Sequence, residues 1–124
     1  MASPTNYAAV RQVLENYIEG SFIADTTLLK SLFHPEAAMS GYLDGTLDIG
    51  TPQPFYEELE ENPSAKESGE AYHAEIVFIH IADAVASASI VEDNLLGVNY
   101  VNHFHLLKID GAWKIVSKIY TDVT

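Results

Sequence analysis

Residues 98–121 read VNYVNHFHLLKIDGAWKIVSKIYT, and this stretch decides the fold class. The runs 98–109 and 112–121 have the residue types of β-strands and are separated by the pair Asp110-Gly111. An Asp-Gly pair between two such runs is the strongest short signal of a β-hairpin with a two-residue turn. We therefore expect a C-terminal hairpin in which Ile109 pairs with Ala112.

This register distributes the hairpin side chains between two faces, because successive side chains of a strand point in opposite directions. One face holds Tyr100, Asn102, Phe104, Leu106, Trp113, Ile115, Ser117 and Ile119. The other holds Val101, His103, His105, Leu107, Lys114, Val116, Lys118 and Tyr120. The first face is the more apolar, so we assign it to the core. The assignment depends on the turn, since a slip of one residue exchanges the faces of one strand.

Further strands are predicted upstream of this hairpin. Residues 72–82 and 84–92 form two strands around a tight turn near Asp83, and residues 37–49 form two short strands around Asp44-Gly45. The four long strands follow one another in meander order and come after the helices. This order predicts an α+β fold with an antiparallel sheet and helices packed on one face.

Three helices are predicted before the long strands. Residues 6–23 carry apolar residues at spacings of three and four, the pattern of an amphipathic helix. Asp25 can cap a short second helix, which His34-Pro35 ends because the residue before a proline is displaced from the α region. Thr51-Pro52 predicts the start of a third helix, which runs to about Glu61 and is followed by a polar loop.

Length and composition limit the class of function. With 124 residues the chain is expected to be one domain, residues 1–124, large enough for a core and a pocket. Its 18 acidic and 6 basic residues give a net charge of −12, which disfavours binding to nucleic acid or to an anionic membrane face. The absence of cysteine excludes disulfides, thiolate catalysis and cysteine-ligated metals. We see no signal-peptide pattern and no apolar run of membrane-spanning length, and we expect a cytoplasmic protein.

Three stretches carry a resemblance to a known superfamily. They are YIEGSFIADTTLLKSLFHPEAAMSGY (17–42), DGTLDIGTPQPFYEEL (44–59) and FHLLKIDGAWKIVSKIY (104–120). In their order and local pattern they resemble the nuclear-transport-factor-2-like superfamily, and within it the small stand-alone branch labelled SnoaL-like or "putative lumazine-binding". The resemblance implies a cystatin-like cone fold, in which three helices pack on a strongly curved, mostly antiparallel sheet that encloses a pocket. It also implies a homodimer built through the convex face of the sheet.

The resemblance places the pocket at the wide end of the cone, with aromatic walls and a few polar contacts. The residues expected to bind the ligand are Tyr17, Phe33, Met39, Tyr42, Phe55, Tyr56, Asn102, Phe104 and Ser117. An apolar cavity with few convergent hydrogen-bonding groups suits a small hydrophobic or aromatic molecule. No cofactor is implied.

The catalytic signals are weaker than the fold signals, and one scaffold of this kind supports many reactions. Ketosteroid-isomerase-like chemistry needs a carboxylate base, a tyrosine and a protonated acid. The segment 37–41 has no acid, and Asn102 stands where relatives often carry Asp, so that only Tyr17 fits a role. A dehydratase-like site would instead use His34 as a general base, with Tyr42 and Tyr56 in reach. His34 has a structural alternative, which is to cap helix carbonyls beside Pro35.

The pair His103-x-His105 has the spacing of a metal chelate, because residues i and i+2 of a strand share a face. The predicted register puts both histidines on the convex face, with Lys118 directly opposite His103. A lysine in that place would repel a cation. We therefore interpret the pair as interface or surface histidines and expect no metal site.

Three functions follow, in order of preference. The first is a dimeric small-molecule-binding domain with an aromatic-lined pocket. The second is an enzyme of the dehydratase, isomerase or cyclase type, with His34, Tyr17 and Tyr56 as its candidate catalytic residues. The third is an assembly or interaction module with a vestigial pocket.

Overall fold

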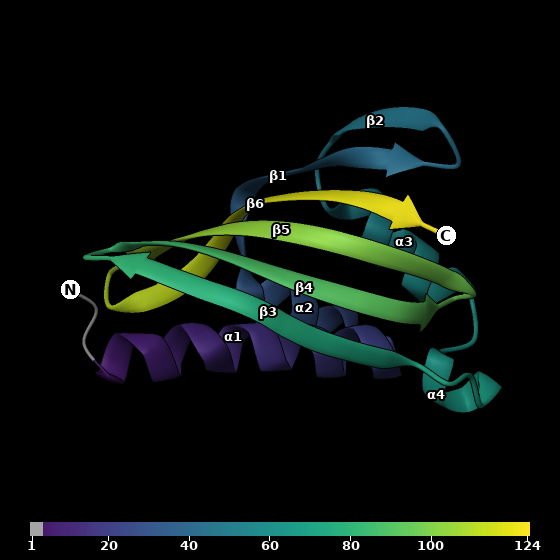
Figure 1. Ribbon diagram of the computed structural model, residues 1–124, viewed down its shortest axis with the longest axis horizontal. Helices are drawn as coiled ribbons and strands as arrows, with labels where there is room; N and C mark the ends of the chain where they lie inside the picture. The colour runs from purple at the N-terminus through teal and green to yellow at the C-terminus, as the bar shows by residue number, and fades with distance from the viewer. Residues whose placement is uncertain (1–3) are drawn as a thin grey trace.

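The computed structural model describes residues 4–124, with helices that pack against a single six-stranded sheet (Figure 1). The helices are α1 (Pro4–Ile23), α2 (Thr26–Leu32), α3 (Gln53–Glu61) and the short α4 (Ala65–Ser68). The strands are β1 (Phe33–Leu43), β2 (Thr46–Gly50), β3 (His73–Ala82), β4 (Val85–Leu95), β5 (Val98–Ile109) and β6 (Ala112–Val123). None of the helices within residues 4–124 is long and apolar enough to cross a membrane.

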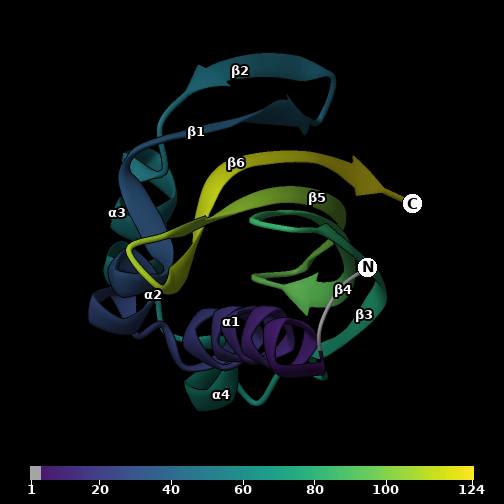
Figure 2. The ribbon, with the colours of Figure 1, turned by 90° about the vertical axis from the view of Figure 1, so that its left-hand side faces the viewer.

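The strands lie in the order β2-β1-β6-β5-β4-β3, and every neighbouring pair is antiparallel except β1 and β6. The sheet is strongly curved, and its concave side wraps around α1 (Figure 2). This architecture confirms the predicted α+β fold with helices on a curved, mostly antiparallel sheet. One expectation was wrong in detail, because the segment after α3 contains α4, whose N-cap Ser64 accepts a hydrogen bond from the Glu67 N–H.

Two tight turns were predicted from Asp-Gly pairs, and both are present. Asp44 and Gly45 have φ angles of 51° and 77°, and Asp110 and Gly111 have φ angles of 49° and 83°. Positive φ at both central residues is the requirement of the type I′ turn, whose twist matches that of the flanking strands. The C-terminal turn pairs Ile109 with Ala112, as predicted.

The predicted register of this hairpin fails halfway along β6. Pairing runs regularly to Leu106 and Ile115, but the next pair is His105 with Ser117, so Val116 is an extra residue. Such a β-bulge moves all later side chains of one strand to the opposite face. Lys118 therefore lies opposite Phe104 on the concave face, while Ser117 turns outward. Ile119, 53% exposed, also lies outside, whereas Tyr120 lines the concave side, so the predicted placement of all four side chains, Ser117, Lys118, Ile119 and Tyr120, was wrong.

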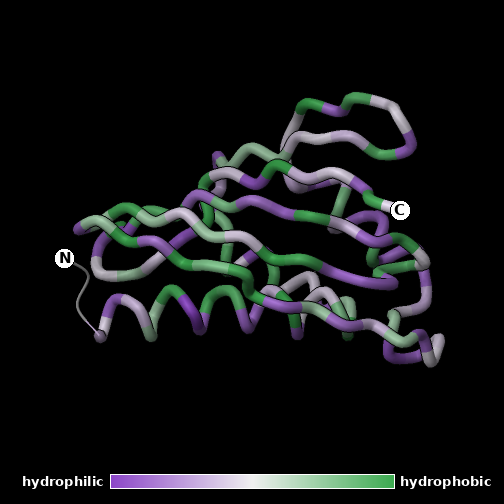
Figure 3. Tube along the Cα trace, viewed as in Figure 1, coloured by the Kyte–Doolittle hydropathy of each residue, from purple (hydrophilic) through white to green (hydrophobic). Residues whose placement is uncertain are grey.

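The core lies between α1 and the concave face of the sheet. Hydrophobic and hydrophilic residues alternate along α1 and along the strands, so each element has an inner and an outer side (Figure 3). Val10, Leu14 and Tyr17 of α1 are fully buried and belong to the same hydrophobic cluster as Ile90 and Phe104 of the sheet. Burial of each such side chain contributes about 1.5–3 kcal/mol, and this packing holds the concave surface in shape.

Candidate functional site

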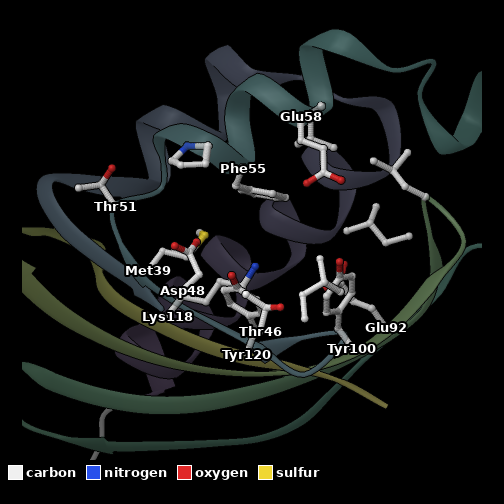
Figure 4. A pocket seen from close by; sticks show the side chains of 15 residues that line it. Met39, Thr46, Asp48, Thr51, Phe55, Glu58, Glu92, Tyr100, Lys118 and Tyr120 are labelled. Atoms are coloured by element: carbon white, nitrogen blue, oxygen red, sulfur yellow. The ribbon is translucent and has the colours of Figure 1, made fainter. Parts of the chain in front are cut away.

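A cavity of about 290 Å³ lies at one end of the concave face, between the sheet and α3. Its walls come from all six elements around it: β1, β2, α3, β4, β5 and β6. The side chains that decide its chemistry are Met39, Phe55, Glu92, Tyr100, Lys118 and Tyr120. Phe55 and Glu58 of α3 face Lys118 and Tyr120 of β6 across this space (Figure 4).

Lys118 is the central polar group of the cavity. Its side chain is buried, at 5% exposure, and its Nζ donates a hydrogen bond of 2.7 Å to the Tyr17 hydroxyl. The same Nζ lies 4.5 Å from the ring centroid of Phe55, 5.2 Å from that of Tyr17 and 5.4 Å from that of Tyr120. Burial lowers the pKa of Lys118 from 10.5 to about 8, although the carboxylates of Glu92 and Glu58 oppose this effect.

Glu92 is a second buried charged group in the cavity wall, with an exposure of 1%. Its Oε2 accepts a hydrogen bond of 2.7 Å from the Tyr72 hydroxyl, and its Oε1 accepts one of 2.7 Å from Asn102 Nδ2. A carboxylate can only accept, so the Asn102 amide must turn its NH₂ group toward Glu92. The Asn102 Oδ1 is then left without a hydrogen-bond partner among residues 4–124.

The tyrosines around the cavity stay protonated at neutral pH. Burial, followed by the charge of Glu92, raises the pKa of Tyr17 well above its usual value. Burial and the carboxylates of Glu58 and Glu92 raise the pKa of Tyr100 to about 12. Burial and the adjacent Asp48 carboxylate also raise the pKa of Tyr120. These phenols therefore keep their protons and cannot act as bases near neutral pH.

Several residues predicted to line the pocket are close to this cavity. Met39 and Phe55 lie in its wall. Tyr17 reaches it through the Lys118 amine, and its ring packs edge-on against Phe104 with centroids 4.9 Å apart. Asn102 is fully buried and positions Glu92. The structure thus brings five of the predicted residues into or directly behind one site.

The other predicted residues lie elsewhere. Phe33 and Tyr56 belong to the hydrophobic core and pack against each other with centroids 6.1 Å apart. Burial raises the pKa of Tyr56 to about 12. Tyr42 is 51% exposed, and Ser117 lies with it on the outer side of the sheet.

The three histidines singled out in the sequence are also outside the cavity wall. His34 lies at the junction of α2 and β1, where its Nδ1 accepts a hydrogen bond of 3.0 Å from the Glu36 N–H. His103 and His105 are exposed on the convex face. The predicted neighbour of His103 was wrong, because Ile119 lies opposite it instead of Lys118.

Sequence reasoning missed the charged residues of the site. Lys118 was placed on the convex face because a bulge leaves no mark in the alternation of apolar residues. Glu92 was taken as the end of a strand, although the strand continues to Leu95. One signal was present for each: Lys118 is the one charged residue between positions 115 and 121, and Glu92 follows the uncharged stretch 84–91.

The chain is similar in sequence and in fold to known proteins. Residues 5–121 match the family described as "Putative lumazine-binding". An NTF2-like protein of unknown function from Shewanella baltica OS155 is 31% identical, with a TM-score of 0.87 over 100% of this chain and 98% of that one. One from Methylobacillus flagellatus KT is 24% identical, with a TM-score of 0.88 over 99% and 96%.

The sequence is also similar to that of Aldolase FrzH from Cladobotryum sp. The two sequences are 28% identical over 116 residues, which cover 94% of this chain and 90% of the aldolase. The family match spans almost the whole chain, and the structural neighbours share the curved sheet and its helices. This chain therefore belongs to the putative lumazine-binding family of NTF2-like proteins.

Proposed function

We propose that the chain binds a small planar organic molecule carrying a hydrogen-bond acceptor, such as a carbonyl oxygen, in the cavity around Lys118. The observation that carries the proposal is the Lys118 amine, which is buried among the rings of Phe55, Tyr17 and Tyr120 in the cavity wall. A lysine Nζ has more protons than the single one donated to Tyr17, and the remaining protons can be donated to a ligand.

The size and charge of the cavity narrow the ligand class. A volume of about 290 Å³ is at the small end of ligand pockets, which span roughly 300–1,000 Å³, and fits a molecule of one or two rings. Asp48, Glu58 and Glu92 face Lys118 as the charged groups of the wall. Three carboxylates against one amine disfavour an anionic ligand, so we expect a neutral one.

The test is thermal denaturation with a series of neutral one-ring and two-ring carbonyl heterocycles. A ligand that binds only the folded state raises the melting temperature. The Thr46→Trp variant places a large side chain at the exposed rim of the cavity and is expected to abolish the shift. Thr27→Trp, on the exposed side of α2, is the matched control and should keep it. No shift for any ligand, or an equal shift in both variants, would refute the proposal.

We also infer that the functional unit is a homodimer formed through the convex face of the sheet. Tyr42, Leu47, Ile49 and Ile119 are all more than half exposed, and together with Val101 they line one apolar depression on that face. Exposed apolar patches of this kind mark interaction surfaces. Sedimentation should give a dimer for the native chain and a monomer for Ile119→Asp or Val101→Asp. An unchanged dimer in both variants would place the interface elsewhere.

A second candidate function is carbon–carbon bond chemistry. The name of the relative Aldolase FrzH raises this possibility, and the buried amine of Lys118 is the feature that favours it. The test is proton NMR of cyclohexanone in deuterated buffer, which reports exchange of hydrogens next to the carbonyl. Lys118→Met should lower protein-dependent exchange by about tenfold or more, and the exposed-site control Lys66→Met should not. No exchange above the buffer rate would exclude this candidate.

A further inference from the structure

The environment of Lys118 is unusual for a lysine that serves only the fold. Within residues 4–124, no carboxylate oxygen lies within ion-pair distance of its Nζ. Its hydrogen-bond partner is the neutral phenol of Tyr17, and its other near neighbours are aromatic rings. A desolvated ammonium without an adjacent counterion is costly, and a methionine would fill the same space without that cost.

The same environment favours the neutral amine, which is the nucleophilic form of lysine. Glu92 and Glu58 raise the pKa of Lys118, but burial is the larger effect and leaves it at about 8. Near pH 7 roughly a tenth of the amine is neutral, against less than a thousandth of an ordinary lysine. The four other lysines of the chain are Lys30, Lys66, Lys108 and Lys114. None of these four lies in the cavity wall.

We propose that Lys118 captures a small aldehyde or ketone in the cavity as a covalent iminium. The inference rests on the proposed function, because it requires the carbonyl compound to enter this cavity. It adds to that function by naming the substrate class and by giving Lys118 a covalent role. The rings around Nζ hold the carbonyl carbon against the amine and shield the cation that forms.

Iminium formation consumes the amine and the carbonyl compound and releases water. The neutral Nζ donates its lone pair to the carbonyl carbon, the C–N bond forms, and the π electrons of the carbonyl move to oxygen, which takes up a proton. The C–O bond of this carbinolamine then breaks, a C=N bond forms, and the oxygen leaves as water after taking a second proton. One of these protons comes from the attacking nitrogen, and the other is the proton that the ammonium released beforehand. An ammonium and a carbonyl thus become an iminium and water, with no change in total charge.

Glu92 is the group that we assign to hold the proton between these steps. Because no carboxylate oxygen in the described part of the chain lies within ion-pair distance of the Lys118 Nζ, we assign a bridging water to carry the proton between the two groups. The Glu92 carboxylate lies in the same wall as Lys118 and is fully buried. Tyr72 and Asn102 fix both of its oxygens in place through hydrogen bonds of 2.7 Å. The phenols of Tyr17 and Tyr100 have raised pKa values and cannot serve as bases near pH 7.

The experiment is reductive trapping of the full chain with benzaldehyde and sodium cyanoborohydride at pH 7.0, followed by peptide mapping by mass spectrometry. We expect modification of Lys118 to be at least about tenfold faster than that of exposed Lys66, because far more of its amine is neutral. Lys118→Met should lose the fast adduct, and Lys66→Met should retain it. Modification spread evenly over the lysines, or undiminished in Lys118→Met, would overturn the proposal.

Two further variants test whether the carbonyl compound enters the cavity and whether Glu92 takes part in the reaction. Thr46→Trp leaves Lys118 in place but narrows the cavity, and it should lose the fast adduct if the carbonyl enters there. Glu92→Gln should slow trapping at Lys118 when the rates are compared at pH 9.5, where the amine is neutral with or without the carboxylate that raises its pKa. A fast adduct that survives Thr46→Trp would refute capture inside the cavity.

The melting temperature distinguishes a failure of covalent capture from a failure of ligand binding in the cavity. The melting temperature is measured with benzaldehyde, and with the heterocycle series, in the absence of reductant. A thermal shift that Thr46→Trp abolishes, without fast trapping at Lys118, means that the pocket binds its ligand without covalent capture. The absence of both the shift and the adduct refutes both proposals.

Discussion

Replacement of Lys118 by methionine should change how the stability of the protein depends on pH. The pKa of Lys118 is lowered from 10.5 to about 8 by burial. Between these two values the unfolded chain binds a proton that the folded chain lacks, so the stability of the native protein rises with pH. Lys118→Met removes this proton and with it the pH-dependent contribution.

The magnitude follows from the two pKa values. At pH 7.0 the lowered pKa destabilises the native fold by about 3 kcal/mol relative to an ordinary lysine. At pH 9.5 only about 1 kcal/mol of this cost remains, because the unfolded lysine has itself begun to lose its proton. Between pH 7.0 and pH 9.5, the free energy of unfolding of the native chain should therefore rise by about 2 kcal/mol relative to that of Lys118→Met.

The assay is urea denaturation at pH 7.0 and pH 9.5, followed by the fluorescence of Trp113, the single and buried tryptophan. The lost hydrogen bond to Tyr17 costs the variant the same at both pH values and cancels in the comparison. Titration of the other groups is common to both chains. Lys66→Met, at an exposed position, serves as the control and should show no shift. If the free energy of unfolding of the native chain relative to Lys118→Met changes by less than about 0.5 kcal/mol, the inference that the Lys118 amine is desolvated in the fold is refuted.

Three further predictions concern the supports of the site. Tyr72→Phe removes one hydrogen bond to buried Glu92 and should cost about 1–3 kcal/mol in the same assay, whereas Tyr7→Phe at an exposed position should cost little. Asn102→Asp places a carboxyl beside Glu92 and should cost about 3 kcal/mol or more at pH 7. Because the introduced carboxyl has a raised pKa in the fold, this loss should shrink as the pH falls toward 5, and a constant loss would contradict the reasoning. Gly41→Ala should unfold the protein or cost several kcal/mol, because the added Cβ falls on the Tyr120 backbone carbonyl, whereas Gly50→Ala meets open space and should be tolerated.

Local patterns were sufficient to predict most of the fold. The apolar spacing in residues 6–23 predicted α1, and the Asp-Gly pairs predicted two turns, because each signal depends only on neighbouring residues. The curvature of the sheet and the parallel pairing of β1 with β6 depend on contacts between distant segments. The family resemblance implied the curvature, but no local pattern did.

The site could be predicted only in part. The family resemblance implied an aromatic-lined pocket, and Met39 and Phe55, two of the residues expected to line it, lie in the cavity wall. Lys118 and Ser117 were placed on the wrong faces because the bulge at Val116 shifts the register after Ile115. Packing and the hydrogen bond to Tyr17 offset the free-energy cost of burying the Lys118 amine. Neither contribution can be predicted from the pattern of apolar residues.

The bulge at Val116 has an evolutionary consequence. With one residue inserted between Val116 and Ser117, Ser117 and Ile119 would occupy the inner positions that Lys118 and Tyr120 now hold, whereas deletion of the extra residue Val116 would leave Lys118 and Tyr120 facing inward. A single-codon insertion in β6 can therefore replace the amine of Lys118 in the cavity wall by a hydroxyl and an aliphatic side chain, with no substitution elsewhere in the chain. Relatives of this chain should accordingly be sorted first by the length of this strand between the turn and its last residues, and only then by the identity of the residues that line their cavities.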